Sequence, residues 1–423
     1  MAPTTTSPSQ THFQRVFKAF GYRDFRLMFI GACISSVGTW MQNLAQAWLV
    51  LDITRSPFYL GLDAFLAGIP VFLLSILGGV VADRVERRRV LLISQYIQMA
   101  SAFTLTLLLI FHVVRLPDES HQIGSGIWYI LCLSFVCGTA QSFGGPAYSA
   151  LIPTLVKKED MPNAIALNSI QFNLARILGP AIGGVVLARL GSVWCFGLNG
   201  LSFLAPVISL TILTTRYLPE KTGESMVSSL KQGFQFIRRQ GAMEALIFLA
   251  FIMTALGFPM MTFLPWFART TFHGGPFTLT LFMCSSGVGA VAGSLLVAWM
   301  GNAQHKGRIA LLSLVWLGAG IGIFALSTNL VLSCIVLFLT GIGLMTVFAN
   351  VNSLVQLITP NEMRGRVMSV YNSAFRGGMP MGNLMTGYLV PKFTAPYVLT
   401  ANGLALLAIA LYFLFAQRKV ATL

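Results

Sequence analysis

The sequence predicts an all-α membrane protein with twelve transmembrane helices in two pseudo-symmetric six-helix bundles. Three observations lead to this fold class: the composition, the recurrence of long apolar runs, and an internal repeat. The 423 residues are 55% hydrophobic and only 10% charged, whereas about a quarter of the residues in a soluble domain are charged. The composition therefore excludes an ordinary soluble domain and predicts a polytopic membrane protein.

Apolar runs long enough to cross a bilayer recur along the whole chain, because a hydrocarbon core about 30 Å thick needs about 20 apolar residues per helix. The predicted spans are residues 25–51, 57–82, 90–114, 126–149, 164–188, 193–214, 242–268, 276–300, 308–327, 330–357, 367–390 and 395–416. The first run is too long for a cleavable signal peptide. The predicted divisions are a tail of residues 1–24, an N-terminal bundle of 25–214, a central loop of 215–241, a C-terminal bundle of 242–416 and a tail of 417–423.

The basic residues orient these spans, because Lys and Arg near membrane spans stay on the cytoplasmic side. An even number of spans places both termini on one side. Of the 28 Lys and Arg residues, the opposite side holds only Arg55, Arg115, Arg189, Arg269 and Lys392. We therefore expect cytoplasmic termini and a multi-pass protein of the cytoplasmic (inner) membrane. The same topology explains the formal net charge of +15 without nucleic-acid binding.

The chain also repeats itself internally. An offset of 219 residues aligns six positions without a gap: Gly38 with Gly257, Met41 with Met260, Pro57 with Pro276, Phe58 with Phe277, Gly68 with Gly287, and Arg89 with Arg308. A second offset, near 204, aligns residues 168–169 with 372–373. Two six-helix halves joined by a cytoplasmic loop are the parallel-repeat plan of secondary transporters.

Residues 78–92, GGVVADRVERRRVLL, form a short basic loop between two apolar runs. Asp83 there lies at a helix end, where a carboxylate can accept hydrogen bonds from the N-terminus of a neighbouring helix. The arginines can bind acidic or carbonyl groups when the cytoplasmic side closes. The segment would then act as a latch between conformations. The alternative is that the arginines only set the topology.

Two segments carry a resemblance to a known family. Residues 78–92 resemble the cytoplasmic-loop signature of the major facilitator superfamily through Gly79, Asp83, Arg84, Arg87 and Arg88. The family often has Gly where Glu86 stands, and Asn302 replaces the aspartate in the symmetry-related segment. The fifth span is similar to an antiporter motif through Gly179, Pro180, Gly183 and Gly184, with Ala175 in place of its leading Gly.

The whole pattern resembles most the branch of drug and macrolide efflux pumps and enterobactin exporters. This resemblance implies the major facilitator fold and export of a small molecule. Independently of it, small residues allow close helix approach, and Pro180 bends its span. The alternative is that the fifth-span motif gives tight packing without any influence on the direction of transport.

Three ionisable residues are embedded within the predicted spans: Asp63, Arg176 and Arg376. Charged groups are costly in lipid and usually face a transport pathway or a partner. We therefore expect these three to be the candidates for proton coupling. No histidine lies in the middle of a span, so a proton relay would rest on carboxylates. The alternatives are that Asp63 reaches the outer interface and that Arg176 supports a helix end.

Polar and sulfur-containing side chains of four spans suggest a cavity, because the resemblance implies that the first, fourth, seventh and tenth spans line one. The candidate cavity residues are Gln42, Asn43, Gln46, Gln141, Met260, Trp266 and Asn350. Polar groups among Met and aromatic residues suit an amphiphilic substrate better than a small sugar. The fourth span has no arginine, unlike many drug:proton antiporters.

We thus expect a secondary active transporter that exports an amphiphilic small molecule by proton antiport with alternating access. An importer or a lipid transporter of the same fold is the alternative, and a non-transporting membrane sensor is a third hypothesis. No catalytic cluster, metal-ligand spacing or nucleotide-binding loop is present in the sequence, so we predict no enzyme, cofactor or metal site. The expected partners are the substrate, protons and the bilayer, and we expect a monomer.

Overall fold

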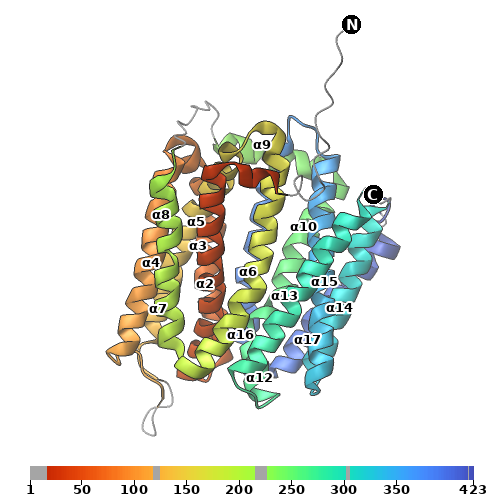
Figure 1. Ribbon diagram of the computed structural model, residues 1–423. Helices are drawn as coiled ribbons and strands as arrows, with labels where there is room; N and C mark the ends of the chain where they lie inside the picture. The colour runs from red at the N-terminus through yellow and green to blue at the C-terminus, as the bar shows by residue number, and fades with distance from the viewer. Residues whose placement is uncertain (1–16, 118–123, 215–225, 302–304, 418) are drawn as a thin grey trace, which may run out of the picture.

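The computed structural model describes residues 17–117, 124–214, 226–301, 305–417 and 419–423. The described chain is built from helices, most of them long and side by side (Figure 1), which confirms the all-α prediction. The start of α2 and the C-terminus lie at the same end of the molecule (Figure 1), which we call the terminal end. The opposite end is called the far end.

Each predicted span has a helical counterpart. In the first half these are α2 (Arg23–Thr54), α3 (Pro57–Arg84), α4 (Arg87–Ile110), α5 (Ile127–Leu151), α6 (Met161–Leu190), and α7 (Ser192–Ser202) followed by α8 (Leu204–Ile212). In the second half they are α10 (Gly241–Gly257) with α11 (Pro259–Thr262) and α12 (Leu264–Thr270), then α13 (Pro276–Met300), α14 (Lys306–Leu326), α15 (Leu330–Ile358), α16 (Arg364–Phe393) and α17 (Ala395–Leu411) with η4 (Tyr412–Ala416).

Short helical turns accompany the long helices: η1 (Lys18–Gly21) precedes α2, while η2 (Ile152–Leu155) and η3 (Lys158–Asp160) join α5 to α6. Among the described residues, 10 helical segments are long and apolar enough to cross a membrane. The two other long segments, α2 and α16, are not among these 10. Polar and charged side chains interrupt their apolar runs, including Gln42, Asn43 and Gln46 in α2 and Arg376 in α16.

The seventh predicted span is not one continuous helix. It is broken into α10, α11 and α12, and Pro259 and Pro265 lie in the first turns of the second and third pieces. A proline removes a backbone donor and clashes with the preceding turn, so it favours a break in a helix. Both breaks, at Phe258 and Phe263, lie within two residues of a proline.

Two segments expected as loops are largely helical. In residues 78–92, α3 continues to Arg84 and α4 begins at Arg87, so the turn is only Val85 and Glu86. In the expected central loop, α9 (Met226–Arg239) forms a helix that packs against α10 and α16. Residues 215–225 of that loop, most of the N-terminal tail and Asn302 lie outside the described residues. The helical turns in these two connecting segments were not expected, because an apolar-run criterion does not detect amphipathic or charged helical turns.

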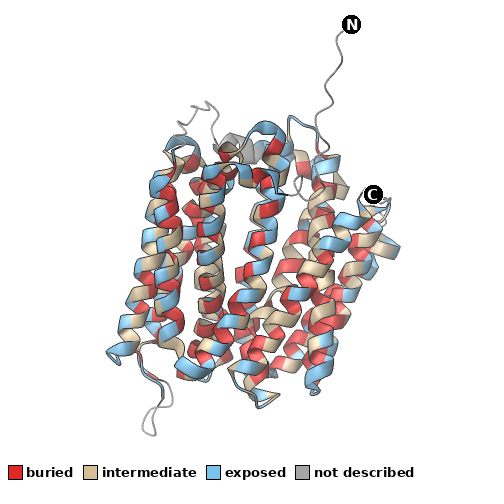
Figure 2. Cartoon of the chain, viewed as in Figure 1, coloured by how far each residue is buried: buried red, intermediate tan, exposed pale blue. Residues whose placement is uncertain are grey.

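Helices of the two halves pack against each other along two seams, α3 with α16 and α6 with α13. Glycines permit the close approach: Gly61 of α3 packs against Asn383 and Gly387 of α16, and Gly184 of α6 packs against Thr280 of α13. A side chain at either glycine would overlap these neighbours. Figure 2 shows buried residues along the long helices, with exposed residues between them.

The glycine contacts between α3 and α16 are found toward the far end. The one nearest the terminal end is between Phe72 and Gly377. Nearer the terminal end, a Cβ atom added at Gly79 of α3 or at Gly365 of α16 would meet nothing within 4 Å. The two halves are therefore packed together toward the far end, and these two glycines have free space beside them at the terminal end.

Candidate functional site

Asp63 of α3 is held by neutral donors from two other helices. The amide nitrogen Nε2 of Gln46 in α2 donates to both carboxylate oxygens, at 3.1 and 2.9 Å. The hydroxyl of Ser134 in α5 donates to Oδ1 at 2.5 Å and is itself 2.8 Å from the Gln46 amide. Asp63 therefore joins three helices of the first half.

Arg176 and Arg376 are not paired with Asp63. In the described part of the chain, the ion pairs join other residues, and the contact found for the Arg176 guanidinium is the Trp40 ring of α2, with its centroid 5.8 Å away. Trp40 also meets Phe172 of α6 edge-on, with ring centroids 6.1 Å apart. The three candidates for proton coupling therefore lie apart in this conformation: Asp63 has neutral donors, and the two guanidinium groups are separate from it.

Helical periodicity shows which way four of the predicted polar residues face. Asn43, Gln141, Arg176 and Arg376 each lie nine residues from an apolar or cysteine side chain that is exposed, namely Ile34, Cys132, Val185 and Met385 respectively. Nine residues are about two and a half turns of an α-helix, so the two members of each pair lie on opposite faces. We call the polar side the inner face.

The four polar side chains on the inner face are at least partly exposed. Asn43, Gln141 and Arg376 are exposed, and Arg176 is half-buried, although all four are in the middle of long helices. Their helices, α2, α5, α6 and α16, belong to both halves of the chain. The inner faces are therefore not filled by apolar packing at these positions.

Four other cavity candidates have packing roles in this conformation. Gln42 accepts a hydrogen bond of 2.6 Å from the Asn199 amide of α7. Asn350 is buried and donates to the Thr346 carbonyl at 2.8 Å. Met260 is 1% exposed, and Trp266 packs against the same hydrophobic core. Met260 and Asn350 do not line an open cavity here, because both side chains are buried.

The fifth-span motif joins α6 to helices of both halves. Gly179 packs against Trp40 and Val37 of α2, and Gly183 packs against Met41. Gly184 faces Thr280 of α13, and Pro180 is buried within α6. The motif thus gives close packing, and one of its glycines lies in the seam between the halves.

The basic segment binds carbonyl groups of its own half. Arg87 donates to the carbonyls of Ala82 and Ala150, at 3.3 and 2.8 Å. Arg88 donates to the carbonyls of Leu213 and Thr211, at 3.3 and 2.7 Å. These bonds tie the terminal ends of α3, α4, α5 and α8 together.

Asp83 and Arg84, by contrast, are exposed. The Asp83 side chain is 57% exposed, and its nearest cation is Arg87, with Nη2 3.9 Å from Oδ1. The Asp83 carboxylate is therefore available to a further partner, as a latch would require, whereas Arg87 and Arg88 already have theirs.

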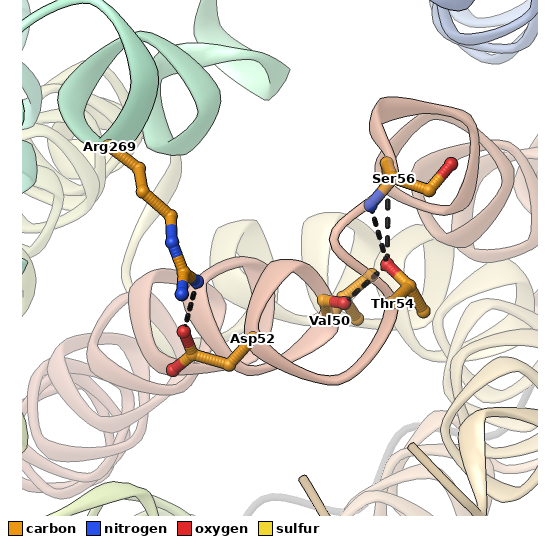
Figure 3. Close-up of polar contacts among 5 residues, drawn as sticks. All are labelled: Val50, Asp52, Thr54, Ser56 and Arg269. Atoms are coloured by element: carbon orange, nitrogen blue, oxygen red, sulfur yellow. Dashed lines mark hydrogen bonds and ion pairs between the residues drawn. The ribbon is translucent and has the colours of Figure 1, made fainter. Parts of the chain in front are cut away.

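Sequence reasoning missed an ion pair between the two halves. Asp52, near the far end of α2, accepts a hydrogen bond from Arg269 of α12 (Figure 3), and both side chains are partly exposed. The two residues are 217 positions apart. Arg269 counted only as a topology signal, and no local pattern links it to Asp52.

A repeated sequence pattern was also missed. Arg176 precedes Pro180 by four residues, and Arg376 precedes Pro380 by four, so an offset of 200 aligns both residues. This offset differs from the two that the internal repeat gave. The pattern places one arginine four residues before a proline in the fifth long helix of each half, which neither arginine indicates alone.

Comparisons with known proteins cover nearly the whole chain. A model of the family described as transmembrane secretion effectors matches residues 16–422. Enterobactin exporters of Citrobacter koseri and Escherichia coli O81 are each 26% identical over 92% of this chain, and the matches cover 90% and 91% of their own lengths.

Solved structures with the same fold include a peptide transporter and a nucleoside transporter. The peptide transporter has a TM-score of 0.74 and 14% identity, covering 98% of this chain and 99% of its own. The nucleoside transporter has a TM-score of 0.73 and 12% identity, covering 94% and 99%. At such low identity these two similarities establish the fold alone.

Proposed function

The chain belongs to the transmembrane secretion effector family of the major facilitator superfamily, and we propose that it is a secondary active transporter that exports an amphiphilic small molecule. The observation that carries this proposal is the family match over residues 16–422, together with exporters among the relatives that align over nine-tenths of their length. The substrate is drug-like, siderophore-like or a related metabolite.

In the proposed topology all twelve long helical segments span the cytoplasmic membrane and the terminal end faces the cytoplasm. The basic residues support this orientation, because few of them lie in the far-end connections. The α2 and α16 segments would cross despite their polar residues because their inner faces are turned away from lipid, where polar side chains are tolerated. The protein acts as a monomer in this scheme.

Transport would proceed by alternating access. The glycine-packed seams and the Asp52–Arg269 pair join the halves toward the far end, while Gly79 and Gly365 have free space at the terminal end. This arrangement supports assigning the structure to the inward-facing state. Export then requires the far end to separate and the terminal end to close around the bound substrate.

Proton antiport would use Asp63. It lies within α3, nearly two turns from the far-end start of the helix, and its donors are neutral. A carboxylate without a cation partner can exchange a proton without breaking an ion pair. An arginine keeps its own proton in proteins. Arg176 and Arg376 can therefore take part in coupling only through the electrostatic effect of their charges on the protonation of Asp63.

Accumulation of fluorescent amphiphiles in cells tests the proposal. Cells that express the chain should accumulate less of at least one member of a panel of cationic, neutral and anionic amphiphiles than cells with an empty vector. A protonophore should remove the difference, because it collapses the proton gradient. Higher accumulation would identify an importer, and equal accumulation of every probe would contradict export of this substrate class.

A further inference from the structure

Arg176 and Arg376 are the two embedded guanidinium groups for which the described part of the chain provides no carboxylate. Two acids of the first half have partners of their own, Asp63 in Gln46 and Ser134, and Asp52 in Arg269. The Arg176 side chain is half-buried, so it has lost part of its water without gaining an ionic partner, which is unfavourable. Arg176 therefore favours an anion supplied from outside the chain.

Both arginines occupy the same place relative to the seams. Arg176 is next to Ile177, whose side chain packs against Gly287 of α13 and whose carbonyl lies 3.6 Å from the Cys284 sulfur. Arg376 is next to Gly377, which packs against Phe72 of α3. Each guanidinium thus lies on an inner face where the packing between the halves ends, the position that a molecule entering from the terminal end would reach last.

The side chains around Arg176 offer a ligand an apolar surface as well as a positive charge. Trp40 and Phe172 lie beside it, and Phe172 is 52% exposed although it belongs to the middle of α6. Phe172 and Arg176 are four residues apart, so both lie on one face of α6. A guanidinium offers a planar fork of donors to a carboxylate, sulfonate or phosphate, and the adjacent rings offer an apolar surface.

We propose that Arg176 binds the anionic group of the transported molecule while Trp40 and Phe172 contact its apolar part, so that the substrate class is amphiphilic organic anions. This inference rests on the proposed export function and specifies the charge of its substrate. Arg376, in the corresponding helix α16 of the other half, gives the inner faces a second positive group. The site uses Arg176 as an anion receptor, a role distinct from proton coupling.

Binding of matched pyrene probes to the purified full-length protein in detergent tests this site. Pyrenesulfonate, pyrenemethanol and pyrenemethylamine share one apolar body and differ in charge. By fluorescence anisotropy, the wild type should bind pyrenesulfonate at least about tenfold more tightly than pyrenemethanol, the scale of one charge-assisted hydrogen bond. Arg176→Gln should remove this preference, and Arg176→Lys should retain part of it.

Two further variants separate charge from packing. Arg189→Gln removes an exposed arginine from the same helix, near its far end, and should leave all three affinities unchanged. Trp40→Phe should weaken all three probes to a similar extent. Size-exclusion chromatography establishes that each variant is monodisperse. If the Arg176→Gln protein is not monodisperse, two measurements test the anion site instead: the preference of the wild type for pyrenesulfonate over pyrenemethanol, and the part of that preference that Arg176→Lys retains.

The inference is overturned if the wild type does not prefer pyrenesulfonate, or if a monodisperse Arg176→Gln protein keeps the preference. Transport in cells separates this failure from failure of the proposed function. Export of pyrenemethylamine or pyrenemethanol without any preference for the sulfonate leaves export standing and removes the anion site. Binding of pyrenesulfonate through Arg176, without export of any probe, supports the site and contradicts the exporter.

Discussion

At the scale of single residues, Asp63 shows how far a sequence can predict a site. Its isolation within an apolar run identifies it as a residue with a role, because a charge in lipid is costly. Its partners are not identifiable in the same way, since Gln46 and Ser134 lie on other helices and are ordinary polar residues of spans. Arg176, the embedded cation of the same half, is not paired with Asp63 among the described ion pairs.

Asp63→Asn should abolish uphill export while sparing downhill exchange, because the amide keeps the shape of the side chain but carries no exchangeable acidic proton. The measurement is substrate accumulation in proteoliposomes with and without an imposed pH gradient. Ser134→Ala is the matched control: it removes one donor and keeps the carboxylate, so gradient-driven export should persist. Uphill export at the wild-type rate by Asp63→Asn would place coupling elsewhere.

Lys18 illustrates an ion pair at the terminal end. Its amine lies 2.7 Å from Asp160, and the hydrogen bond to that carboxylate raises the pKa of Lys18 above its usual value. A raised pKa means that this stabilisation is complete below the unfolded value of about 10.4 and is lost as the pH rises through the folded value. Lys18→Gln should therefore lower the melting temperature equally from about pH 6 to about pH 9. A difference that grows or shrinks across this range would implicate another titrating group.

At the scale of elements, the apolar runs predicted the long helices because lipid-facing segments need nearly continuous apolar sequence. The same criterion failed for α9, whose buried Gly233 and Ile237 alternate with exposed residues along a helix that packs on α16. It also failed at the turn between α3 and α4, where arginines are compatible with helix and the chain reverses within Val85 and Glu86.

The α6–α13 seam gives a prediction at this scale. A Cβ atom at Gly184 would overlap Thr280, and overpacking of this kind costs about 1–3 kcal/mol. Gly184→Ala should therefore favour separation of the far end, seen as faster hydrogen exchange in the far-end turns of α6 and α13.

Thr280→Gly in the same chain should restore slow exchange, because it removes the overlapping side chain. Gly365→Ala is the control, since its added Cβ has no neighbour within 4 Å. If hydrogen exchange in Gly184→Ala is as slow as in the wild type, Thr280→Gly has no effect to reverse. That result would mean that this seam does not hold the far end closed.

At the scale of the whole molecule, the sequence predicts two related halves but not how they meet. Asp52 and Arg269 pair across 217 residues, and only the packing of both halves brings them together. An exposed ion pair contributes about 0.2–1 kcal/mol, enough to change a two-state population by up to about fivefold. Either Asp52→Arg or Arg269→Asp alone should shift the protein toward a form open at the far end.

The double variant Asp52→Arg with Arg269→Asp should recover the wild-type population, because the opposite charges face each other again. Spin labels at Ser56 and Thr271, in a variant without native cysteines, would report the far-end distance. If the single and double variants give the same distance distribution, the pair is an incidental surface contact and does not help to close the far end.

Asp83 belongs to the opposite step, closure of the terminal end. Its carboxylate is 57% exposed and 3.9 Å from Arg87, while the neighbouring arginines are bound to carbonyls of their own half. The start of α16 belongs to the other half, and Gly365 there has free space around it. A helix N-terminus favours a negative group, so closure could bring the start of α16 to Asp83.

Asp83→Asn should accordingly favour the form open at the terminal end and reduce transport while expression remains intact. Thiol labelling of a single cysteine placed on the inner face of α5 at Gln141 would measure that population. Glu86→Gln is the matched control, because Glu86 pairs with Arg89 at 2.8 Å within the same segment. Equal labelling and full transport in Asp83→Asn would leave the basic segment as a determinant of topology and of packing within its own half, since Arg87 and Arg88 would still tie the helix ends together.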